Sequence, residues 1–330
     1  NVSAVLAPRY VLPGAVISVR FAIGYTIGEP GSDALTLIRR AGAALKESRS
    51  TKLREPRQFD DRADVHSRNR IRMTTELQQA LEHNEFVFAY QPKFELENRT
   101  LVGAEALLRW KHGLFGEQAP DTFIAVAEDT GLILDIGARG FRTVANYAAE
   151  INRGRRRPLN FAINVSTVEF VHRDMVQFAR KVLEESSVDP AWITLELTES
   201  LLAESSQKVL GIFQDLRALG IGIAIDDFGT GYSSLRYLDA FPVTEVKVDR
   251  SFVRGISQSP AKRLIVESVI KLGRELGITV VAEGVETEAE CLILQQMGCP
   301  QGQGYLFSRP ISAESFDVLA GDGSSPGSRP

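Results

Sequence analysis

The sequence predicts an α/β protein: a (β/α)₈ barrel with an antiparallel first strand pair, preceded by a small N-terminal α/β fragment. Three observations lead to this fold class. Short apolar segments recur along most of the chain, helix-like stretches separate them, and the first two lie close enough to pair as a hairpin. Eight such segments over roughly 250 residues fit a closed barrel better than an open doubly wound sheet.

The strand candidates are short and apolar, as buried parallel strands are. In chain order they are Phe86–Gln91, Leu101–Trp110, Leu159–Val165, Trp192–Leu197, Ile221–Asp226, Val243–Val248, Thr279–Ala282 and Gly304–Phe307. We expect the barrel domain to occupy residues 72–320 and a flexible tail to follow at 321–330.

Residues 1–60 are expected to form a partial domain and a linker. Val16–Thr26 is rich in β-branched and aromatic residues and predicts a strand, and Asp33 is placed to cap a helix over Ala34–Lys46. From Lys46 to Arg72 the chain is polar, which predicts a partly helical linker. A basic nucleic-acid arm is the alternative there, although acidic residues interrupt the basic ones.

The composition is that of an ordinary globular protein, with 24% charged and 44% hydrophobic residues among 330. A net charge of −4 argues against binding to long nucleic acid. The two cysteines, Cys291 and Cys299, imply no disulfide framework, and the four scattered histidines make a zinc site improbable.

The chain has no apolar run long enough to cross a membrane, and it begins with Asn1 rather than Met. We therefore expect a cytoplasmic fragment, or the cytoplasmic part of a membrane-anchored sensor. On this interpretation an upstream sensor domain precedes residue 1 in the full-length protein.

Polar and charged residues recur at the ends of the predicted strands, where barrels of this kind place their active sites. They are Glu105, Asn164, Glu196, Asp226, Asp227, Lys247, Glu283 and Gln303. Each carboxylate alone can be explained as a helix cap. Together the five would repel one another, and one lysine cannot neutralise them, so the group either takes up protons or binds cations.

The donor atoms indicate which cation would bind. All are oxygens, which suits Mg²⁺ or Mn²⁺, with Ca²⁺ as a non-productive, inhibitory binder. Two such ions can activate a water and stabilise the attacking and leaving oxygens of a phosphodiester. Arg109, just beyond Glu105, can hold a phosphate by paired hydrogen bonds. The residues thus predict metal-assisted phosphodiester hydrolysis and leave the substrate open.

The segment EALLRW (Glu105–Trp110) resembles the motif that names the EAL-domain phosphodiesterases. Further segments agree with that family: YQPK (Tyr90–Lys93), FIAVAEDTGLI (Phe123–Ile133), NVS (Asn164–Ser166), ELTES (Glu196–Ser200), DDFGTGYSSL (Asp226–Leu235), KVDRSFV (Lys247–Val253), AEGVET (Ala282–Thr287) and QGYLFSRP (Gln303–Pro310). The resemblance covers about Thr75 to Leu319 and implies a TIM-like barrel.

The resemblance also implies an activity: hydrolysis of cyclic-di-GMP to linear pGpG, which lowers the level of this messenger in bacterial signalling. It assigns the first metal to Glu105, Asn164, Glu196 and Asp226, and the second to Asp226, Asp227 and Glu283. It places Lys247 against the attacking water, and it allows Glu283 to act as a general base instead of a ligand.

Other residues receive roles from the same resemblance. The dinucleotide contacts would be Gln91, Leu107, Arg109 and Gln303. Glu199 would stabilise the loop Asp227–Ser233, which couples metal binding to dimerisation in this family, so a homodimer is expected. The alternative to an active hydrolase is a catalytically silent receptor or scaffold that binds cyclic-di-GMP.

Residues 1–60 resemble the C-terminal end of a GGDEF diguanylate cyclase domain. The similarity rests on FAIG (Phe21–Gly24) and on the helix DALTLIRRAGAAL (Asp33–Leu45). The GGDEF motif itself is absent from this sequence, so the chain is not expected to synthesise cyclic-di-GMP.

Overall fold

The structure is a computed structural model that describes residues 9–12, 15–18, 22–28, 30–50, 56–59, 61–113, 116–118, 120–199, 201, 207–229 and 240–321. The chain divides into two compact units, Asn1–Glu76 and Leu77–Pro330. The boundary lies within the helix α3 (Asp61–His83).

The N-terminal unit contains two small sheets. β1 (Arg9–Leu12) pairs antiparallel with β2 (Ala15–Ser18), and β3 (Gly24–Tyr25) pairs parallel with β4 (Arg57–Gln58). The strand predicted over Val16–Thr26 is therefore represented by two short strands in different sheets. The segment predicted as a linker contains β4 and the first turns of α3.

The helix of this unit, α2 (Ala34–Ser50), begins where the sequence predicts and continues past the predicted end. Asp33 caps it, because its carboxylate accepts a hydrogen bond from the Thr36 N–H at 2.9 Å. Two apolar residues of this helix, Leu35 and Ile38, are 75% and 70% exposed.

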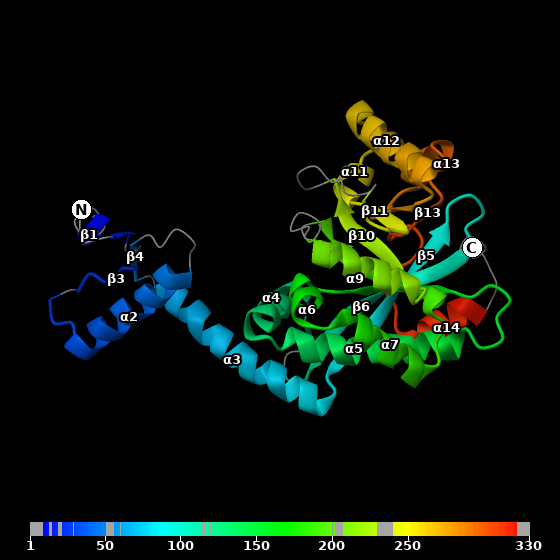
Figure 1. Cartoon of the computed structure of the whole chain (residues 1–330). Helices are drawn as coiled ribbons and strands as arrows, with labels where there is room; N and C mark the ends of the chain where they lie inside the picture. Colours follow the sequence, from blue (N-terminus) through cyan, green and yellow to red (C-terminus); the bar gives the residue numbers. More distant parts are fainter. Residues whose placement is uncertain are drawn as a thin grey trace. The chain divides into compact units, whose positions relative to one another are not determined.

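Eight strands of the second unit close into a ring, so the predicted barrel is confirmed (Figure 1). The hydrogen-bonded order is β5–β13–β12–β11–β10–β9–β8–β6, and β6 pairs back with β5. The ring strands are β5 (Phe86–Glu95), β6 (Leu101–His112), β8 (Asn160–Asn164), β9 (Ile193–Thr198), β10 (Gly222–Phe228), β11 (Glu245–Val248), β12 (Thr279–Ala282) and β13 (Gln301–Gly302). A further strand, β7 (Gly116–Gln118), pairs with β6 outside the ring.

The first strand of the ring runs against both of its neighbours. β5 is antiparallel to β6, as predicted, and it is also antiparallel to β13. Gln91 of β5 lies opposite Glu105 of β6, and Lys93 lies opposite Gly103. Because β5 runs in the reverse direction, Lys93 lies closer than Gln91 to the end of the barrel where the parallel strands begin.

Helices follow the ring strands and surround them (Figure 1). They are α4 (Pro120–Thr130), α5 (Ile133–Ile151), α6 (Thr167–His172), α7 (Met175–Ser186), the 3₁₀ turn η1 (Pro190–Trp192), α9 (Gln207–Ala218), α11 (Arg250–Val253), α12 (Pro260–Leu276), α13 (Glu288–Gln296) and α14 (Ala313–Gly321). Reciprocal capping boxes begin two of them, Ser166 with Glu169 at α6 and Thr287 with Glu290 at α13. These caps fix where the chain turns into a helix after β8 and β12.

The predicted position of the eighth strand is wrong. The strand is β13, and Gly304–Phe307 forms a turn in which the Phe307 N–H donates to the Gly304 carbonyl at 3.1 Å. The apolar run Tyr-Leu-Phe is typical of a strand, but Gly304 packs directly on the backbone of Val285. A Cβ atom on Gly304 would lie 2.2 Å from the Val285 carbonyl oxygen. Gln303 therefore follows the eighth strand instead of opening it.

Successive side chains of a ring strand point in opposite directions, one toward the core beneath the helices and the next into the barrel interior. In β9, Ile193, Leu195 and Leu197 belong to the hydrophobic core that includes the surrounding helices. The residues between them, Thr194 and Glu196, therefore point into the barrel. Glu196 is only 1% exposed although it is charged, so its carboxylate depends on partners inside the ring.

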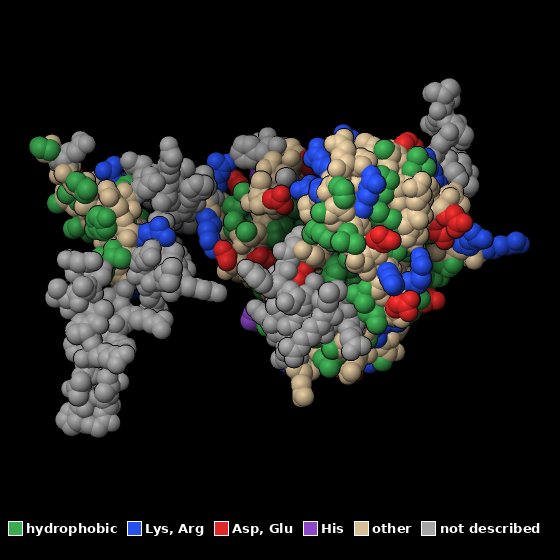
Figure 2. Space-filling view, turned by 90° about the horizontal axis from the view of Figure 1, so that it is seen from above, with side chains coloured by type: hydrophobic (Ala, Val, Ile, Leu, Met, Phe, Trp, Pro, Cys, Tyr) green, Lys and Arg blue, Asp and Glu red, His purple; other side chains and the backbone are tan. Residues whose placement is uncertain are grey.

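The surface of the barrel unit carries charges of both signs. On the face drawn in Figure 2, lysine and arginine side chains are interspersed with aspartate and glutamate. No helix in the described part of the chain is long and apolar enough to cross a membrane. Cys291 and Cys299 are both buried, free thiols.

Candidate functional site

The strand-end residues predicted from the sequence lie together at one end of the barrel. Each ring strand from β6 to β11 contributes side chains to this group, and two more residues directly follow β12 and β13. The group comprises Glu105, Asn164, Glu196, Asp226, Asp227, Lys247, Glu283 and Gln303. The register keeps the strand ends level, since Asn164 of β8 lies opposite Glu196 of β9.

The Lys247 ammonium lies at the centre of the carboxylates. Its Nζ atom is 2.8 Å from Glu196 Oε2, 2.8 Å from Glu283 Oε1, 3.1 Å from Glu105 Oε2 and 3.2 Å from Asp226 Oδ1. Burial favours the neutral amine, but these carboxylates outweigh it and raise the pKa of Lys247 well above its usual value. One positive charge thus faces four carboxylates, and the group retains an excess of negative charge.

Glu105 accepts hydrogen bonds from two side-chain amides in addition to its contact with Lys247. Asn164 Nδ2 donates to its Oε1 at 2.7 Å, and Gln303 Nε2 donates to its Oε2 at 2.8 Å. Burial alone would raise the pKa of Glu105, but Lys247 and these amide donors lower it to about 2. Glu105 is therefore ionised throughout the physiological range.

The other acids of the cluster have raised pKa values. Burial and then the charge of Glu105 raise the pKa of Glu196 well above its usual range. Burial raises the pKa of Glu283 to about 7 despite the contact with Lys247. Burial and the neighbouring Asp226 also raise the pKa of Asp227. Burial is the main cause of each shift, and neighbouring carboxylates add to it, so a bound cation would favour the ionised forms of these acids.

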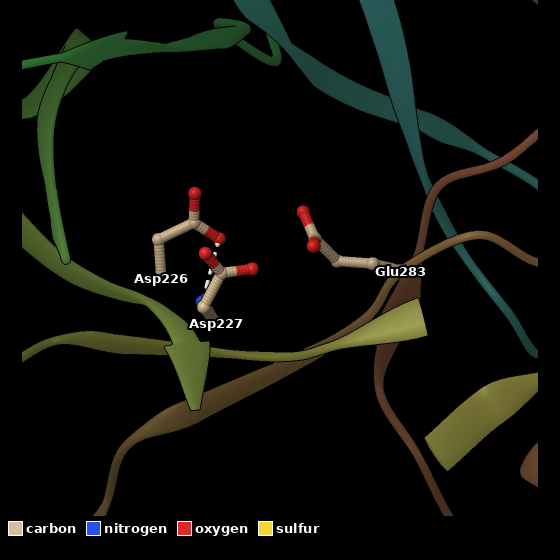
Figure 3. Close-up of side chains that lie close together, drawn as sticks. All are labelled: Asp226, Asp227 and Glu283. Atoms are coloured by element: carbon tan, nitrogen blue, oxygen red, sulfur yellow. Dashed lines mark hydrogen bonds between the residues drawn. The ribbon is translucent and has the colours of Figure 1, made fainter. Parts of the chain in front are cut away.

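Three of the acids are arranged as a potential metal site. One carboxylate oxygen from each of Asp226, Asp227 and Glu283 lies within 4.8 Å of the others. Figure 3 shows the Glu283 carboxylate directed across the barrel mouth toward the two aspartates at the end of β10. Asp227 has φ +55°, and its backbone N–H donates to Asp226 Oδ1 at 2.9 Å, which holds the Asp226 carboxylate against the backbone of Asp227. Carboxylates in such a group suit a hard divalent ion.

Three of the four predicted substrate-contact residues lie on the strand pair that begins the barrel, and the fourth, Gln303, directly follows β13. Glu105, Leu107 and Arg109 alternate along β6 and so share one face of that strand. Arg109 Nε lies 3.4 Å from Glu117 Oε1 on β7, and Arg109 Nη1 donates to the Leu108 carbonyl at 2.9 Å. Gln91 lies opposite Glu105. The strand pair thus places an amide, an apolar side chain and a guanidinium next to the carboxylate cluster.

Glu199 follows β9 and contacts the segment after β10. Its carboxylate accepts a hydrogen bond from the Gly229 N–H at 3.2 Å. The predicted loop Asp227–Ser233 is described only as far as Gly229, and its remaining residues lie outside the described ranges.

Sequence reasoning missed Lys93, to which it gave no role. Its Nζ lies 2.9 Å from Glu245 Oε1 and 4.0 Å from Glu196 Oε1. Lys93 and Glu245 are separated by 152 positions, so no local pattern connects them. An apolar strand interrupted by an inward-facing lysine was the available signal, because such a residue must find a partner inside the barrel.

Comparison with known proteins agrees with this geometry. The model of the EAL domain family matches residues 74–310. The bifunctional diguanylate cyclase/cyclic di-GMP phosphodiesterase MucR of Pseudomonas aeruginosa is 38% identical over 258 residues, which cover 78% of this chain and 38% of the relative. A second cyclic di-GMP phosphodiesterase of that organism is 38% identical over 246 residues, which cover 74% of this chain and 42% of the relative.

A solved structure shows the same similarity to cyclic di-GMP phosphodiesterases. The structure of the PaMucR phosphodiesterase in complex with c-di-GMP superposes with a TM-score of 0.70 at 39% identity, covering 74% of this chain and 99% of that chain. The chain spans about two fifths of the length of the curated relatives it matches. The family match begins at residue 74, so the resemblance of residues 1–60 to a GGDEF domain stays a prediction. From the carboxylate cluster, the closed barrel and these matches together, we conclude that the chain belongs to the EAL domain family.

Proposed function

We propose that this chain hydrolyses cyclic-di-GMP to linear pGpG and that it requires two divalent ions, Mg²⁺ or Mn²⁺. The observation that carries the proposal is the group of carboxylate oxygens from Asp226, Asp227 and Glu283 at the mouth of an EAL-family barrel. Cyclic di-GMP phosphodiesterases among the relatives support the choice of substrate.

The donor set fits divalent metal ions. Its side chains offer only oxygen donors, and one lysine leaves their negative charge in excess. Glu105, Asn164, Glu196 and Asp226 would hold one ion, and Asp226, Asp227 and Glu283 the other. Bound at these residues, the ions would supply Lewis-acid chemistry and neutralise charge on the phosphodiester.

The chain's own residues would orient the reactants. Lys247 presents its ammonium to the space between the carboxylates, where it can hold the attacking water by hydrogen bonding. Glu283 has a pKa of about 7, which suits a proton acceptor near neutral pH as well as a metal ligand. Gln303 donates to both Glu105 and Glu283 and so keeps these two carboxylates at a fixed separation.

The dinucleotide would lie against the first strand pair. Gln91, Leu107, Arg109 and Gln303 would contact it. Arg109 can pair with a phosphate in two parallel hydrogen bonds, and its contact with the exposed Glu117 is weak enough to be exchanged for that phosphate.

The test is a hydrolysis assay with cyclic-di-GMP, in which pGpG is separated and quantified with Mg²⁺, with Mn²⁺ and with excess EDTA. Glu283→Gln should reduce turnover about 100-fold or more, whereas Glu286→Gln, which alters an exposed acid in the same loop, should not. Binding of cyclic-di-GMP without turnover would identify a silent receptor instead. A chain that neither binds nor hydrolyses the dinucleotide would contradict both functions.

A further inference from the structure

We infer that Lys93 is a positioning residue for the metal site. It lies on the side of Glu196 that faces away from Lys247, and there it fixes the direction of the Glu196 carboxylate. The inference rests on the proposed function, because it gives Glu196 the part of a metal ligand. Lys93 lies deeper in the barrel than Glu196 and has no place in the predicted site.

Two lysines and two glutamates alternate through the barrel interior. The order is Glu245, Lys93, Glu196 and Lys247, with Nζ–O distances of 2.9 Å, 4.0 Å and 2.8 Å between successive members. Glu245 and Lys247 are two residues apart on β11, so both face inward, one below the other. Each of the four residues is at most 8% exposed. At this depth, removal of one charge leaves its neighbour without compensation.

The two oxygens of Glu196 face different lysines. Oε2 accepts a hydrogen bond from Lys247 at 2.8 Å. Oε1 is buried and has no hydrogen-bond partner within the described ranges, and Lys93 Nζ lies 4.0 Å from it. The carboxylate is therefore held between two cations. Rotation of the carboxylate would move Oε1 away from Lys93 and Oε2 away from Lys247. Loss of Lys93 removes the constraint on one side only.

Lys93 is separated from the substrate side of the site. It lines a cavity of about 340 Å³ at the end where the parallel strands begin, together with Glu245, Thr194, Thr244 and Thr279. A substitution at Lys93 thus changes the support of Glu196 without altering a residue proposed to touch the dinucleotide. This arrangement predicts an effect on metal affinity in the absence of any substrate.

A purely structural role is the competing explanation, in which Lys93 and Glu245 form a buried pair that stabilises the barrel. Lys93→Met alone cannot separate the two roles, because it also leaves Glu245 buried without its partner. The double variant Lys93→Met/Glu245→Gln removes both charges and restores the balance. If the role is structural, the double variant should recover the properties of the unmutated chain.

The experiment measures Mn²⁺ affinity by calorimetry without cyclic-di-GMP, and the thermal midpoint of each metal-free protein. We expect Lys93→Met and the double variant both to bind Mn²⁺ about 10- to 100-fold more weakly, as loss of an outer-shell partner does. Glu245→Gln keeps Lys93 beside Glu196. Its Mn²⁺ affinity should therefore change less than about threefold, even if its thermal midpoint changes. A double variant that binds Mn²⁺ as tightly as the unmutated chain overturns the inference, as does failure of both Lys93 variants to fold.

Hydrolysis is assayed separately, so the two proposals can fail independently. If the unmutated chain binds Mn²⁺ in a Lys93-dependent manner but does not hydrolyse cyclic-di-GMP, the positioning role stands and the proposed activity fails. If it hydrolyses the dinucleotide but Mn²⁺ affinity is the same with and without Lys93, the activity stands and the positioning role fails. An unmutated chain that binds no Mn²⁺ overturns the positioning role directly.

Discussion

The Glu199 carboxylate accepts a hydrogen bond from the backbone N–H of Gly229, with an N···O distance of 3.2 Å. This bond connects the end of β9 to the residues that follow Asp226 and Asp227. Gly229 has φ +99°, a conformation that a residue with a side chain avoids, and a Cβ there would lie 3.0 Å from the ring of Phe252. The start of this loop is thus held by a side-chain bond and by close packing, directly beside two proposed metal ligands.

Glu199→Ala should therefore lower turnover about 10- to 100-fold while cyclic-di-GMP binding changes only modestly. Loss of the acceptor removes the bond that holds Gly229 beside Asp226 and Asp227, which should shift the metal titration or the monomer–dimer balance. Glu199→Gln retains an acceptor oxygen and is the control. The proposed coupling of this loop to metal binding and dimerisation fails if Glu199→Ala keeps the parental rate, metal titration and oligomeric state.

Metal dependence is the second prediction. Activity should require Mg²⁺ or Mn²⁺ and should be inhibited by Ca²⁺, because Ca²⁺ accepts oxygen ligands in a looser geometry with more ligands. The measurement is the initial rate in each ion, with Ca²⁺ added to the Mg²⁺-loaded protein as a competitor. Hydrolysis that persists undiminished in excess EDTA would contradict the proposed metal site.

Substitution of two glutamates of the same cluster, Glu105 and Glu283, should change the stability of the metal-free protein in opposite directions. The pKa of Glu105 is lowered to about 2, so its stabilising contribution is present above its unfolded pKa and is lost as the pH falls toward 2. The pKa of Glu283 is raised from its usual value of 4.5 to about 7, so the stability that its protonated form contributes is lost as the pH rises through this window. At pH 8, Glu105→Gln should lower the free energy of unfolding and Glu283→Gln should raise it, each by about 1 to 3 kcal/mol.

Urea unfolding at pH 8 in the presence of a chelator measures both variants against the unmutated chain. Neither variant should hydrolyse cyclic-di-GMP at a significant rate, so activity alone cannot distinguish them. Stability changes of the same sign in the two variants would show that Glu105 and Glu283 do not differ in the way their surroundings indicate.

Glu169, a buried acid outside the site, should make the free energy of unfolding depend on pH independently of the site carboxylates. Burial raises the pKa of Glu169 to about 7, against the effects of the Ser166 N–H and Arg173. Between the usual value of 4.5 and about 7 the folded protein binds more protons than the unfolded chain, so the free energy of unfolding falls as the pH rises through this window. Glu169→Gln preserves the capping box and should raise stability at pH 8 by up to about 3 kcal/mol.

The check is the difference in unfolding free energy between the Glu169 variant and the unmutated chain from pH 4.5 to pH 8. Subtracting the two curves removes the contribution of the site carboxylates, which titrate in both proteins. A difference that is constant over this range would show that Glu169 is not the titrating group.

The barrel and the cluster of acids could be predicted because their signals are local. Each strand is a short apolar run, and the carboxylates stand at the ends of such runs, so topology brings them together without knowledge of individual contacts. The position of the last strand could not be predicted in this way, because the turn at Gly304 depends on packing against Val285. The pairing of Lys93 with Glu245 and Glu196 was equally hidden, since residues distant in sequence meet only inside the closed ring.

The contact between Gly304 and Val285 also determines how the mouth of the barrel can move. Beside this contact, the Val285 N–H donates to the Gln303 carbonyl at 3.1 Å and the Leu306 N–H donates to the Val285 carbonyl at 3.0 Å. The segments after β12 and β13 are thereby joined backbone to backbone, while the side chains of Glu283 and Gln303 meet at 2.9 Å. A displacement of either segment carries the carboxylate and the amide together, so the two segments contribute one independent motion to the mouth of the barrel instead of two.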